Sequence, residues 1–206
     1  MKGLCSTDKF LRAILNKETG LLPPKALLSH VGIIESPNYH KLLFLTDMAV
    51  VPLPDLKQKM TLTNYVVKIA RSFGIAKPKV AFIAASEQVL ASMPACLEAA
   101  ALAKMADRGQ IKGCIADGPL ALDVAIDNES VEIKKLTSPV AGDADCLVFP
   151  NIESANVFWK TNSKLATGVR QAGMLVGTTA PCILASRADS VDTKLNSIAE
   201  AVMSVK

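Results

Sequence analysis

Aromatic residues, charges and histidines are scarce in this chain. Of its 206 residues, 4% are aromatic, 20% are charged and two are histidines, His30 and His40. Few aromatics leave little surface on which nucleic-acid bases stack, and the scattered Lys and Arg residues form no dense basic cluster, so we expect no nucleic-acid partner. Neither histidine lies near a Gly-x-Ser-x-Gly elbow or a Cys-His signature. Triad catalysis therefore lacks its base.

The sequence also has no long apolar run, no secretory leader and no paired cysteines. The uncharged stretch from Ala172 to Ser186 is shorter than the roughly 20 apolar residues of a membrane helix, and polar residues follow Met1 before any apolar region forms. The five cysteines are widely spaced, without a CxxC pair. We expect reduced core thiols in a cytoplasmic protein that has no disulfide framework, zinc site or membrane partner.

Motifs for nucleotides and metals are missing as well. No GxGxxG or GxxxxGK[ST] pattern occurs, which removes the usual phosphate-binding loops of dinucleotide and triphosphate enzymes. Asp117 and Asp123 offer two carboxylates, but with no histidine or third carboxylate nearby they make a poor metal set. Gly118-Pro119 between them predicts a turn. We therefore expect no metal.

Aliphatic residues dominate what is present. Half of the residues are hydrophobic, a balance that excludes a disordered chain, and the length suffices for one domain or two small lobes. The formal net charge of +4 is mild. A modest positive excess suits a small anionic substrate that needs two or three well-placed cations.

Short apolar runs alternate with segments of helical period. The runs cover 42–45, 80–85, 113–116, 146–149, 174–176 and 182–185, and helices are expected at 62–73, 97–107, about 153–166 and 191–205. Strands that lack clear polar alternation and are separated by helices indicate a mostly parallel sheet covered on both faces. The sequence therefore predicts the α/β class, with a helical bundle as the alternative.

The last predicted helix has both a cap and an apolar face. Ser190 stands at the N-cap position, and Leu195, Ile198, Ala199 and Val202 share one side. The chain also opens with a helix at Ser6 or Thr7 that no strand precedes. We therefore expect the natural domain to start before Met1.

Two loops carry residues suited to binding an anion. Ser6 or Thr7 caps the first helix, whose free N–H groups attract anions, and Arg12 one turn on adds a cation. Ser186 and Arg187 follow the run at 182–185, and ligands bind beyond the carboxyl ends of parallel strands. The alternatives are an ordinary capped helix in the first case, and in the second a turn with an Asp189–Arg187 ion pair.

Several strings occur together in an order typical of one family. They include Ser29-His30-Val31, Thr46-Asp47, KMADRGQIKG at 104–113, VAGDAD at 140–145 and Ser186-Arg187-Ala188-Asp189-Ser190. The chain resembles the phosphate acetyltransferase and phosphate butyryltransferase family from Met1 to about Val202, and it is most similar to the butyryltransferase branch.

The resemblance implies a reversible acyl transfer between coenzyme A and phosphate. Coenzyme A is then a substrate, its thiolate attacks the acyl carbon directly, and neither a metal nor a covalently bound cofactor takes part. The implied partners are acyl-CoA and phosphate, with butyryl as the expected acyl group. The implied fold has two lobes, like isocitrate and isopropylmalate dehydrogenases, and the implied assembly is a homodimer.

Residue roles follow from matching this chain to the family's motifs. Ser6, Thr7 and Arg12 would bind phosphate on one wall of a cleft, and Ser186 with Arg187 on the other. Where acetyltransferase members carry the aspartate that takes the thiol proton, this chain has Thr193, so Asp192 is our hypothesis for that base. Asp189, or the positive field alone, is the alternative. Further departures are Val51 after Val50, and Ser154-Ala155 in place of Ala-Gly.

Family members carry another βα segment before the position of Met1, so the resemblance implies that the first lobe is incomplete. We expect residues 1–22 and 178–206 to form the remainder of that phosphate-binding lobe, and residues 23–177 to form the second lobe. One alternative is a catalytically impaired coenzyme A-binding or assembly module. Another is a dehydrogenase of the same fold, which would need a nicotinamide site that the sequence does not display.

Overall fold

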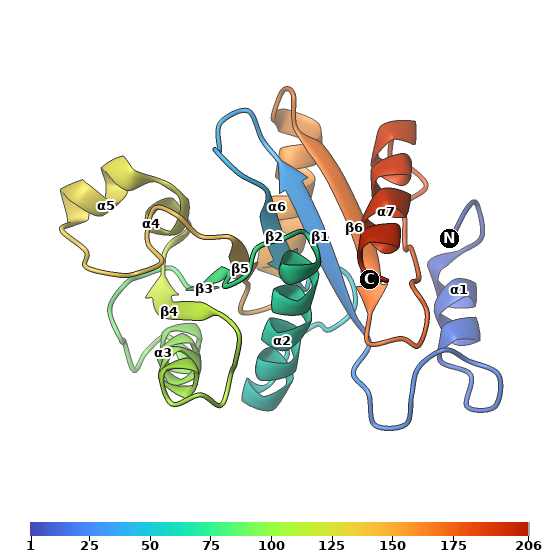
Figure 1. The fold of residues 1–206 in the computed structure, drawn as a ribbon, viewed down its shortest axis with the longest axis horizontal. Coiled ribbons are helices and arrows are strands. Elements are labelled where there is room, and N and C mark those ends of the chain that lie inside the picture. The colour runs from blue at the N-terminus through green and yellow to red at the C-terminus, as the bar shows by residue number, and fades with distance from the viewer. Residues whose placement is uncertain (206) are drawn as a thin grey trace.

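The computed structural model describes residues 1–205 and has an α/β architecture built on one six-stranded sheet (Figure 1). The strand order is β4-β3-β5-β2-β1-β6. The strands are β1 Ser29–Glu35, β2 Leu43–Thr46, β3 Lys79–Ile83, β4 Ile115–Leu120, β5 Cys146–Val148 and β6 Arg170–Val176. The ladders β2–β5, β3–β5 and β3–β4 are parallel, whereas β1 runs antiparallel to both of its neighbours. The prediction of a mostly parallel α/β sheet is confirmed.

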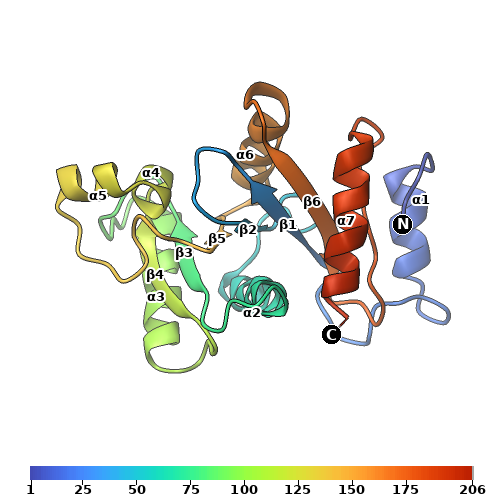
Figure 2. The same cartoon turned by 45° about the horizontal axis from the view of Figure 1, so that its top comes forward.

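Helices cover both faces of the sheet and extend past its β6 edge (Figures 1 and 2). They are α1 Thr7–Ile14, α2 Leu56–Ser72, α3 Pro94–Asp107, α4 Leu122–Ile126, α5 Asn128–Lys134, α6 Ile152–Leu165 and α7 Val191–Met203. Side chains of α2 and α3 join the core on one face, and those of α4 and α6 join the core on the other. Beyond β6 lie α7 and then α1.

The strands are buried on both faces, which explains their unbroken apolar runs. In β2, Phe44 and Leu45 are adjacent and both fully buried, yet they belong to the cores on opposite faces. Successive side chains of a strand point to opposite sides, so a strand covered on both faces needs apolar residues at every position. The helices on both faces of the sheet therefore explain why apolar and polar residues do not alternate along these strands.

The predicted strand at 182–185 is wrong. This segment touches the sheet through a single antiparallel bridge between Leu175 and Cys182, although Cys182, Ile183 and Ala185 are buried. The carbonyl of Ile183 instead accepts a hydrogen bond from the backbone N–H of Lys2, 2.9 Å away. Its backbone groups are therefore satisfied partly by the N-terminal residues, and within residues 1–205 no ladder forms beyond β6.

Two further predictions about strands need correction. Gly118-Pro119 does not form a turn but lies inside β4, an edge strand, where a proline removes no ladder bond on its free side. A Cβ at Gly118 would lie 2.7 Å from the Cβ of Phe82, so glycine allows β4 to approach β3 closely. Sequence reasoning also missed β1, whose apolar residues are interrupted by Ser29, His30 and Gly32.

The apolar face predicted for the last helix points to solvent. Leu195, Ile198 and Val202 are 62%, 42% and 63% exposed, whereas Ser197, Glu200 and Ala201 are buried. The hydroxyl of Ser197 accepts a hydrogen bond from the backbone N–H of Gly173 in β6 at 2.9 Å. That bond orients α7 with its small and polar side toward the sheet. The predicted N-cap is confirmed, because the Ser190 side chain accepts from the Thr193 N–H.

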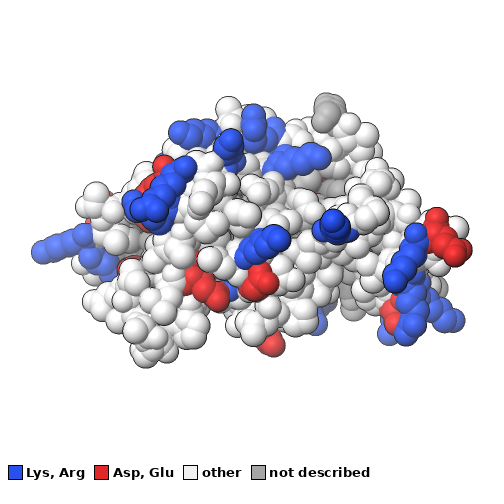
Figure 3. Space-filling view, turned by 90° about the horizontal axis from the view of Figure 1, so that it is seen from below, with Lys and Arg blue, Asp and Glu red and all other residues white. Residues whose placement is uncertain are grey.

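Charged side chains are dispersed over the surface. On the face shown in Figure 3, Lys and Arg lie in several separate groups with large uncharged areas between them. Within residues 1–205, no helix is long and apolar enough to cross a membrane.

Candidate functional site

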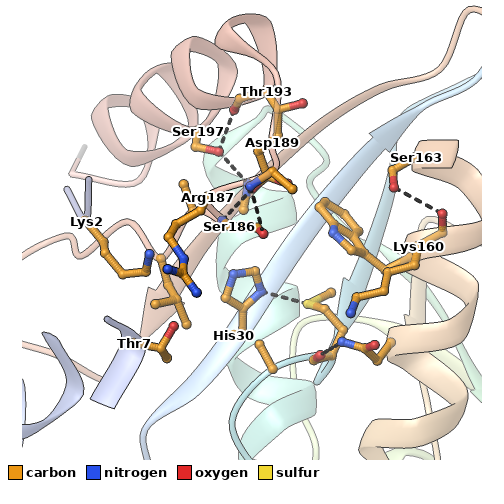
Figure 4. A pocket seen from close by; sticks show the side chains of 18 of the residues that line it. Lys2, Thr7, His30, Lys160, Ser163, Ser186, Arg187, Asp189, Thr193 and Ser197 are labelled. Carbon is orange, nitrogen blue, oxygen red and sulfur yellow. Dashed lines mark hydrogen bonds between the residues drawn. The ribbon is translucent and has the colours of Figure 1, made fainter. Parts of the chain in front are cut away.

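A cavity of about 530 Å³ opens beside β1 and β6, within the size range of small-molecule sites (Figure 4). One wall consists of the N-terminal residues Lys2 and Thr7 together with the segment 184–189. The opposite wall comes from α6, and the floor comes from β1, β6 and the residues after β2. The cavity thus joins the first and last parts of the chain to its middle.

The loop that carries Arg187 is held by short-range hydrogen bonds. Asp189 Oδ2 accepts from the backbone N–H of Ser186 at 2.6 Å, and the Ser186 carbonyl accepts from the Asp189 N–H at 3.2 Å. The side chain of Asp189 is thereby used to close a turn, and no Asp189–Arg187 ion pair forms within residues 1–205. The Arg187 guanidinium points into the cavity toward Lys2 and Thr7 (Figure 4).

The start of α1 supplies the rest of this wall. Thr7 is the first helical residue and lines the cavity, whereas Ser6 caps the helix by accepting from the Lys9 N–H at 3.3 Å. Lys2 also lines the cavity, and the residue as a whole is 3% exposed. Met1-Lys2-Gly3 is one of the strings that match the family, but Lys2 was not among the predicted site residues.

His30 lies on the floor of the cavity. Its Nδ1 is 2.7 Å from the sulfur of Met48, and its backbone N–H donates to Asp47 Oδ2 at 3.3 Å. Burial lowers the pKa of His30, while the Asp47 carboxylate opposes that change to a smaller extent. The imidazole is therefore neutral at pH 7. Sequence reasoning set His30 aside for lack of a triad, although Ser29-His30-Val31 and Thr46-Asp47 were among the matched strings.

The opposite wall is both aromatic and basic. From α6, Asn156, Trp159, Lys160 and Lys164 line the cavity. Lys160 and Lys164 are exposed, lie one helical turn apart and form no ion pair within the part of the chain that the structure describes. The cavity therefore has cations on two opposite sides, Lys2 with Arg187 and Lys160 with Lys164.

The structure brings three of the predicted site residues together and leaves three outside the cavity. Thr7, Ser186 and Arg187 line it, whereas Ser6, Arg12 and Asp192 do not. Arg12 pairs with Asp8 at 2.9 Å on the exposed side of α1, and this hydrogen bond raises the pKa of Arg12. Asp192 is exposed in the first turn of α7, while Asp189 and Thr193 line the cavity. The roles of all these residues remain predictions.

Residues 1–205 contain no group of three His, Cys, Asp or Glu side chains that could hold a metal ion. The cavity instead combines fixed cations, hydroxyl groups and helix N–H donors with an apolar floor. Such an arrangement can bind a molecule that has anionic groups at two places and an apolar part between them.

Comparisons with known proteins agree on one relationship. The family model described as phosphate acetyl/butaryl transferase matches residues 1–202. The chain is 51% identical over 203 residues to the phosphate butyryltransferase of Clostridium acetobutylicum, covering 98% of this chain and 67% of that protein. It is 41% identical to the phosphate acetyltransferase of Rhizobium meliloti, covering 98% of this chain and 64% of that protein.

A solved structure gives the same result. The crystal structure of a branched-chain phosphotransacylase from Enterococcus faecalis V583 superposes with a TM-score of 0.90 at 31% identity, covering 99% of this chain and 72% of that one. The chain thus spans about two thirds of the length of these curated relatives.

Proposed function

Because this chain belongs to the phosphate acetyl/butaryl transferase family, we propose that it transfers a short acyl group reversibly between coenzyme A and inorganic phosphate. In one direction acyl-CoA and phosphate give acyl phosphate and coenzyme A. Butyryl is the proposed acyl group, since two relatives at 51% identity are named phosphate butyryltransferase. We propose the cytoplasm as the location, because the widely spaced cysteines fit a reducing compartment, and a homodimer as the assembly from the resemblance alone.

The observation that carries the proposal is the convergence of Arg187, Lys2 and Thr7 on one wall of the cavity. The planar guanidinium of Arg187 matches two phosphate oxygens, and the ammonium of Lys2 adds a second charge. Thr7 brings a hydroxyl and the free N–H groups at the start of α1. Ser186 offers a further hydroxyl from the adjacent loop. This wall is the proposed phosphate site, and Ser6 and Arg12 are kept as proposed contacts on the strength of the resemblance.

The second pair of cations supports coenzyme A as the other substrate. Coenzyme A carries phosphate groups at its nucleotide end, far from its thiol. Lys160 and Lys164 face the cavity across from Arg187, so they are placed to attract that end while the thiol reaches the phosphate wall. Two separated cationic groups suit a long substrate with charge at one end and chemistry at the other.

In the direction from acyl phosphate, the coenzyme A thiolate forms a bond to the acyl carbon. The bond from that carbon to the phosphate oxygen breaks, and the departing phosphate takes the electron pair. Arg187 and Lys2 neutralise the charge that grows on the phosphate. A free thiol has a pKa near 8.5, so a base that removes its proton increases the reactive fraction at neutral pH.

The proposed base is an aspartate at the start of α7. Asp192 is the position closest to the family's pattern, but its side chain is exposed outside the cavity, whereas Asp189 lines the cavity next to Arg187. Geometry favours Asp189. The positive field of the wall alone would also lower the thiol pKa and is the alternative.

The proposed division into lobes, with residues 1–22 and 178–206 in one and 23–177 in the other, is supported by the walls of the cavity. Lys2, Thr7 and the segment 184–189 come from the first set of residues, and α6 and the floor come from the second. All six strands lie within 23–177, and the first set contributes α1 and α7. The proposed site therefore lies where the two sets of residues meet.

The direct test mixes the protein with butyryl-CoA and phosphate and follows the free thiol. The proposal predicts thiol release that requires phosphate and that falls by about 100-fold or more in Arg187→Ala, since an arginine that stabilises developing charge contributes several kcal/mol. Arg108→Ala serves as a control, because Arg108 follows α3 and does not line the cavity. Thiol release without phosphate, or none at all, contradicts the proposal.

One observation supports a second function. Five apolar side chains of α7 and the residues after it are exposed at helical spacing, namely Val191, Leu195, Ile198, Val202 and Val205. Such a face is typical of a surface that meets another polypeptide. The alternative is therefore a module that binds coenzyme A or assembles with a partner without turnover. Calorimetry separates the two, because a module binds coenzyme A but makes no phosphate-dependent product.

A further inference from the structure

Two paired glycines lie beneath side chains that line the cavity, and one of them, Gly173, lines it itself. Gly32 of β1 and Gly173 of β6 are direct partners in the antiparallel ladder. Because paired residues point to the same side of a sheet, both expose bare backbone on the side that α6 covers. His30, two residues before Gly32, lies on that side as well.

Large side chains rest on these glycines. A Cβ at Gly32 would lie 2.7 Å from Cζ3 of Trp159 and 2.8 Å from Cε of Met48, and a Cβ at Gly173 would lie 2.6 Å from Cε1 of His30. Neither position leaves room for a methyl group. The indole, the thioether and the imidazole therefore pack directly against the backbone of the sheet. A Cβ at either glycine would push them into the cavity.

Trp159 and Met48 give the cavity an apolar surface between the two pairs of cations, with the imidazole of His30 beside them. Trp159, Met48 and His30 all line the cavity, together with Ile152 and Leu184. The imidazole of His30 is neutral and lies between Arg187 and Lys160 in Figure 4. A bound anion finds no charged partner on the indole ring or the thioether, whereas an alkyl chain loses contact with water there.

We propose that Trp159 and Met48 contact the acyl chain of the substrate and set the chain length that the enzyme accepts. This inference rests on the proposed function and extends it to the group being transferred. With the phosphate at Arg187, an acyl chain directed over Gly173 meets Met48 and then the indole of Trp159. On this proposal the indole borders the space that the chain occupies, so its size influences how many methylenes fit.

Two variants change this space in opposite directions. Trp159→Leu enlarges the cavity, and Gly32→Ala pushes Trp159 and Met48 into it. For each variant, kcat/KM is measured with acetyl-CoA, butyryl-CoA and hexanoyl-CoA at saturating phosphate. We expect the hexanoyl-to-butyryl ratio to rise about tenfold or more in Trp159→Leu, and the acetyl-to-butyryl ratio to rise in Gly32→Ala, because one methylene changes discrimination by roughly 10-fold or more.

The matched control is Phe158→Leu. Phe158 neighbours Trp159 on α6 and packs against the same core, but it does not line the cavity. If Trp159 has a purely structural role, Trp159→Leu and Phe158→Leu should each lower kcat/KM by the same factor for all three acyl-CoA thioesters. Equal losses in Trp159→Leu and Phe158→Leu therefore overturn the inference.

A binding experiment keeps the inference separate from turnover. Trp159 is the sole tryptophan of the chain, so its fluorescence reports on this subsite directly. We expect butyryl-CoA to change the emission more than coenzyme A does at matched saturation. If the parent protein and all variants are inactive, the proposed function is wrong. The fluorescence titration then tests by itself whether Trp159 contacts the acyl chain. Identical emission with butyryl-CoA and coenzyme A overturns the inference whether or not turnover is seen.

Discussion

Asp189 closes the loop that presents Arg187, because its Oδ2 accepts the Ser186 backbone N–H at 2.6 Å. The Ala188 N–H also donates to the Ser186 hydroxyl at 3.3 Å, and Ser190 caps the following helix. Three consecutive local bonds thus order an exposed turn. The consequence is that Arg187 reaches the cavity from a fixed backbone, which limits the entropy lost when an anion binds.

The dual position of Asp189 gives the first prediction. An Asp189→Asn substitution keeps an oxygen for the Ser186 N–H but removes the basic carboxylate, whereas Asp189→Ala removes both. If Asp189 takes the thiol proton, Asn lowers kcat by about 100-fold, within the usual range for general bases. Asp192→Asn is the comparison, for which we expect less than a twofold change.

A large loss of kcat in Asp192→Asn, with little change in Asp189→Asn, would identify Asp192 as the base. An unchanged kcat in both Asn variants, with a loss in Asp189→Ala, would leave Asp189 as a positioning residue and the field of the cations as the activator.

The second prediction concerns Arg12, whose proposed phosphate role rests on the resemblance. Its ion pair with Asp8 is exposed on both sides, with the side chains 79% and 67% accessible. Exposed pairs of this kind contribute little, so the guanidinium is free to turn toward a bound anion. We expect Arg12→Ala to raise the KM for phosphate about tenfold while kcat changes less. Asp8→Ala is the control that removes the pair but keeps Arg12, and an unchanged KM in Arg12→Ala would exclude Arg12 from the site.

The third prediction tests Lys160 and Lys164 as anchors for the nucleotide end of coenzyme A. The double change to alanine should raise the KM for butyryl-CoA about tenfold or more, since a charge-assisted hydrogen bond contributes about 1.5 kcal/mol. Butyryl-pantetheine lacks the nucleotide phosphates, so its KM should stay within twofold. Lys57→Ala is the control, because Lys57 is exposed on α2 away from the cavity. Equal effects on both thioesters would contradict the assignment.

The fourth prediction concerns stability and rests on Glu200. This residue is 1% exposed, and neither of its carboxylate oxygens has a hydrogen-bond partner among residues 1–205. Burial raises the pKa of Glu200 well above its usual value. The folded state thus binds the proton more tightly than the unfolded state, whose Glu pKa is about 4.3. Stability from this residue is present below that pH and is lost as pH rises toward the folded pKa.

Glu200→Leu should therefore raise the free energy of unfolding at pH 7 by about 1–3 kcal/mol, the usual cost of a buried unsatisfied polar group. Urea unfolding at about pH 4 and pH 7 measures it, and the gain should shrink at the lower pH. Glu200→Gln is the control that keeps a polar group but removes the titration. A stability difference that is the same at both pH values would contradict the explanation.

Local sequence patterns predicted much of the fold because they depend on neighbours in the chain. The strands near 42–45, 80–85 and 146–149, the Ser190 cap and the helix that ends before Gly74 all follow from short-range periodicity and capping. Local patterns gave a wrong prediction where the bonding partner of a segment is distant in the sequence. The segment 182–185 is apolar enough for a strand but bonds to Lys2 instead of extending the ladder.

The site could be predicted in part for the same reason. Thr7 and Arg187 each belong to a recognisable helix-start loop, so their residue types were informative. That they meet on one wall of the cavity depends on how α1 and α7 pack beside β6, which no local pattern contains. His30 was set aside and Trp159 was missed, because their positions in the cavity depend on the two paired glycines beneath them. The apolar stripe of α7 was recognised from its spacing, but the spacing did not show that this side of the helix faces solvent instead of the sheet.

The central claim is that phosphate held at Arg187 attacks, or leaves, the acyl carbon. Phosphorus NMR of the protein with butyryl-CoA and phosphate tests it most directly, since acyl phosphate and inorganic phosphate give separate signals. We predict butyryl phosphate in amounts equal to the coenzyme A released, with both lost in Arg187→Ala. Release of coenzyme A with no acyl phosphate, or equal yields from the parent protein and Arg187→Ala, would contradict the account.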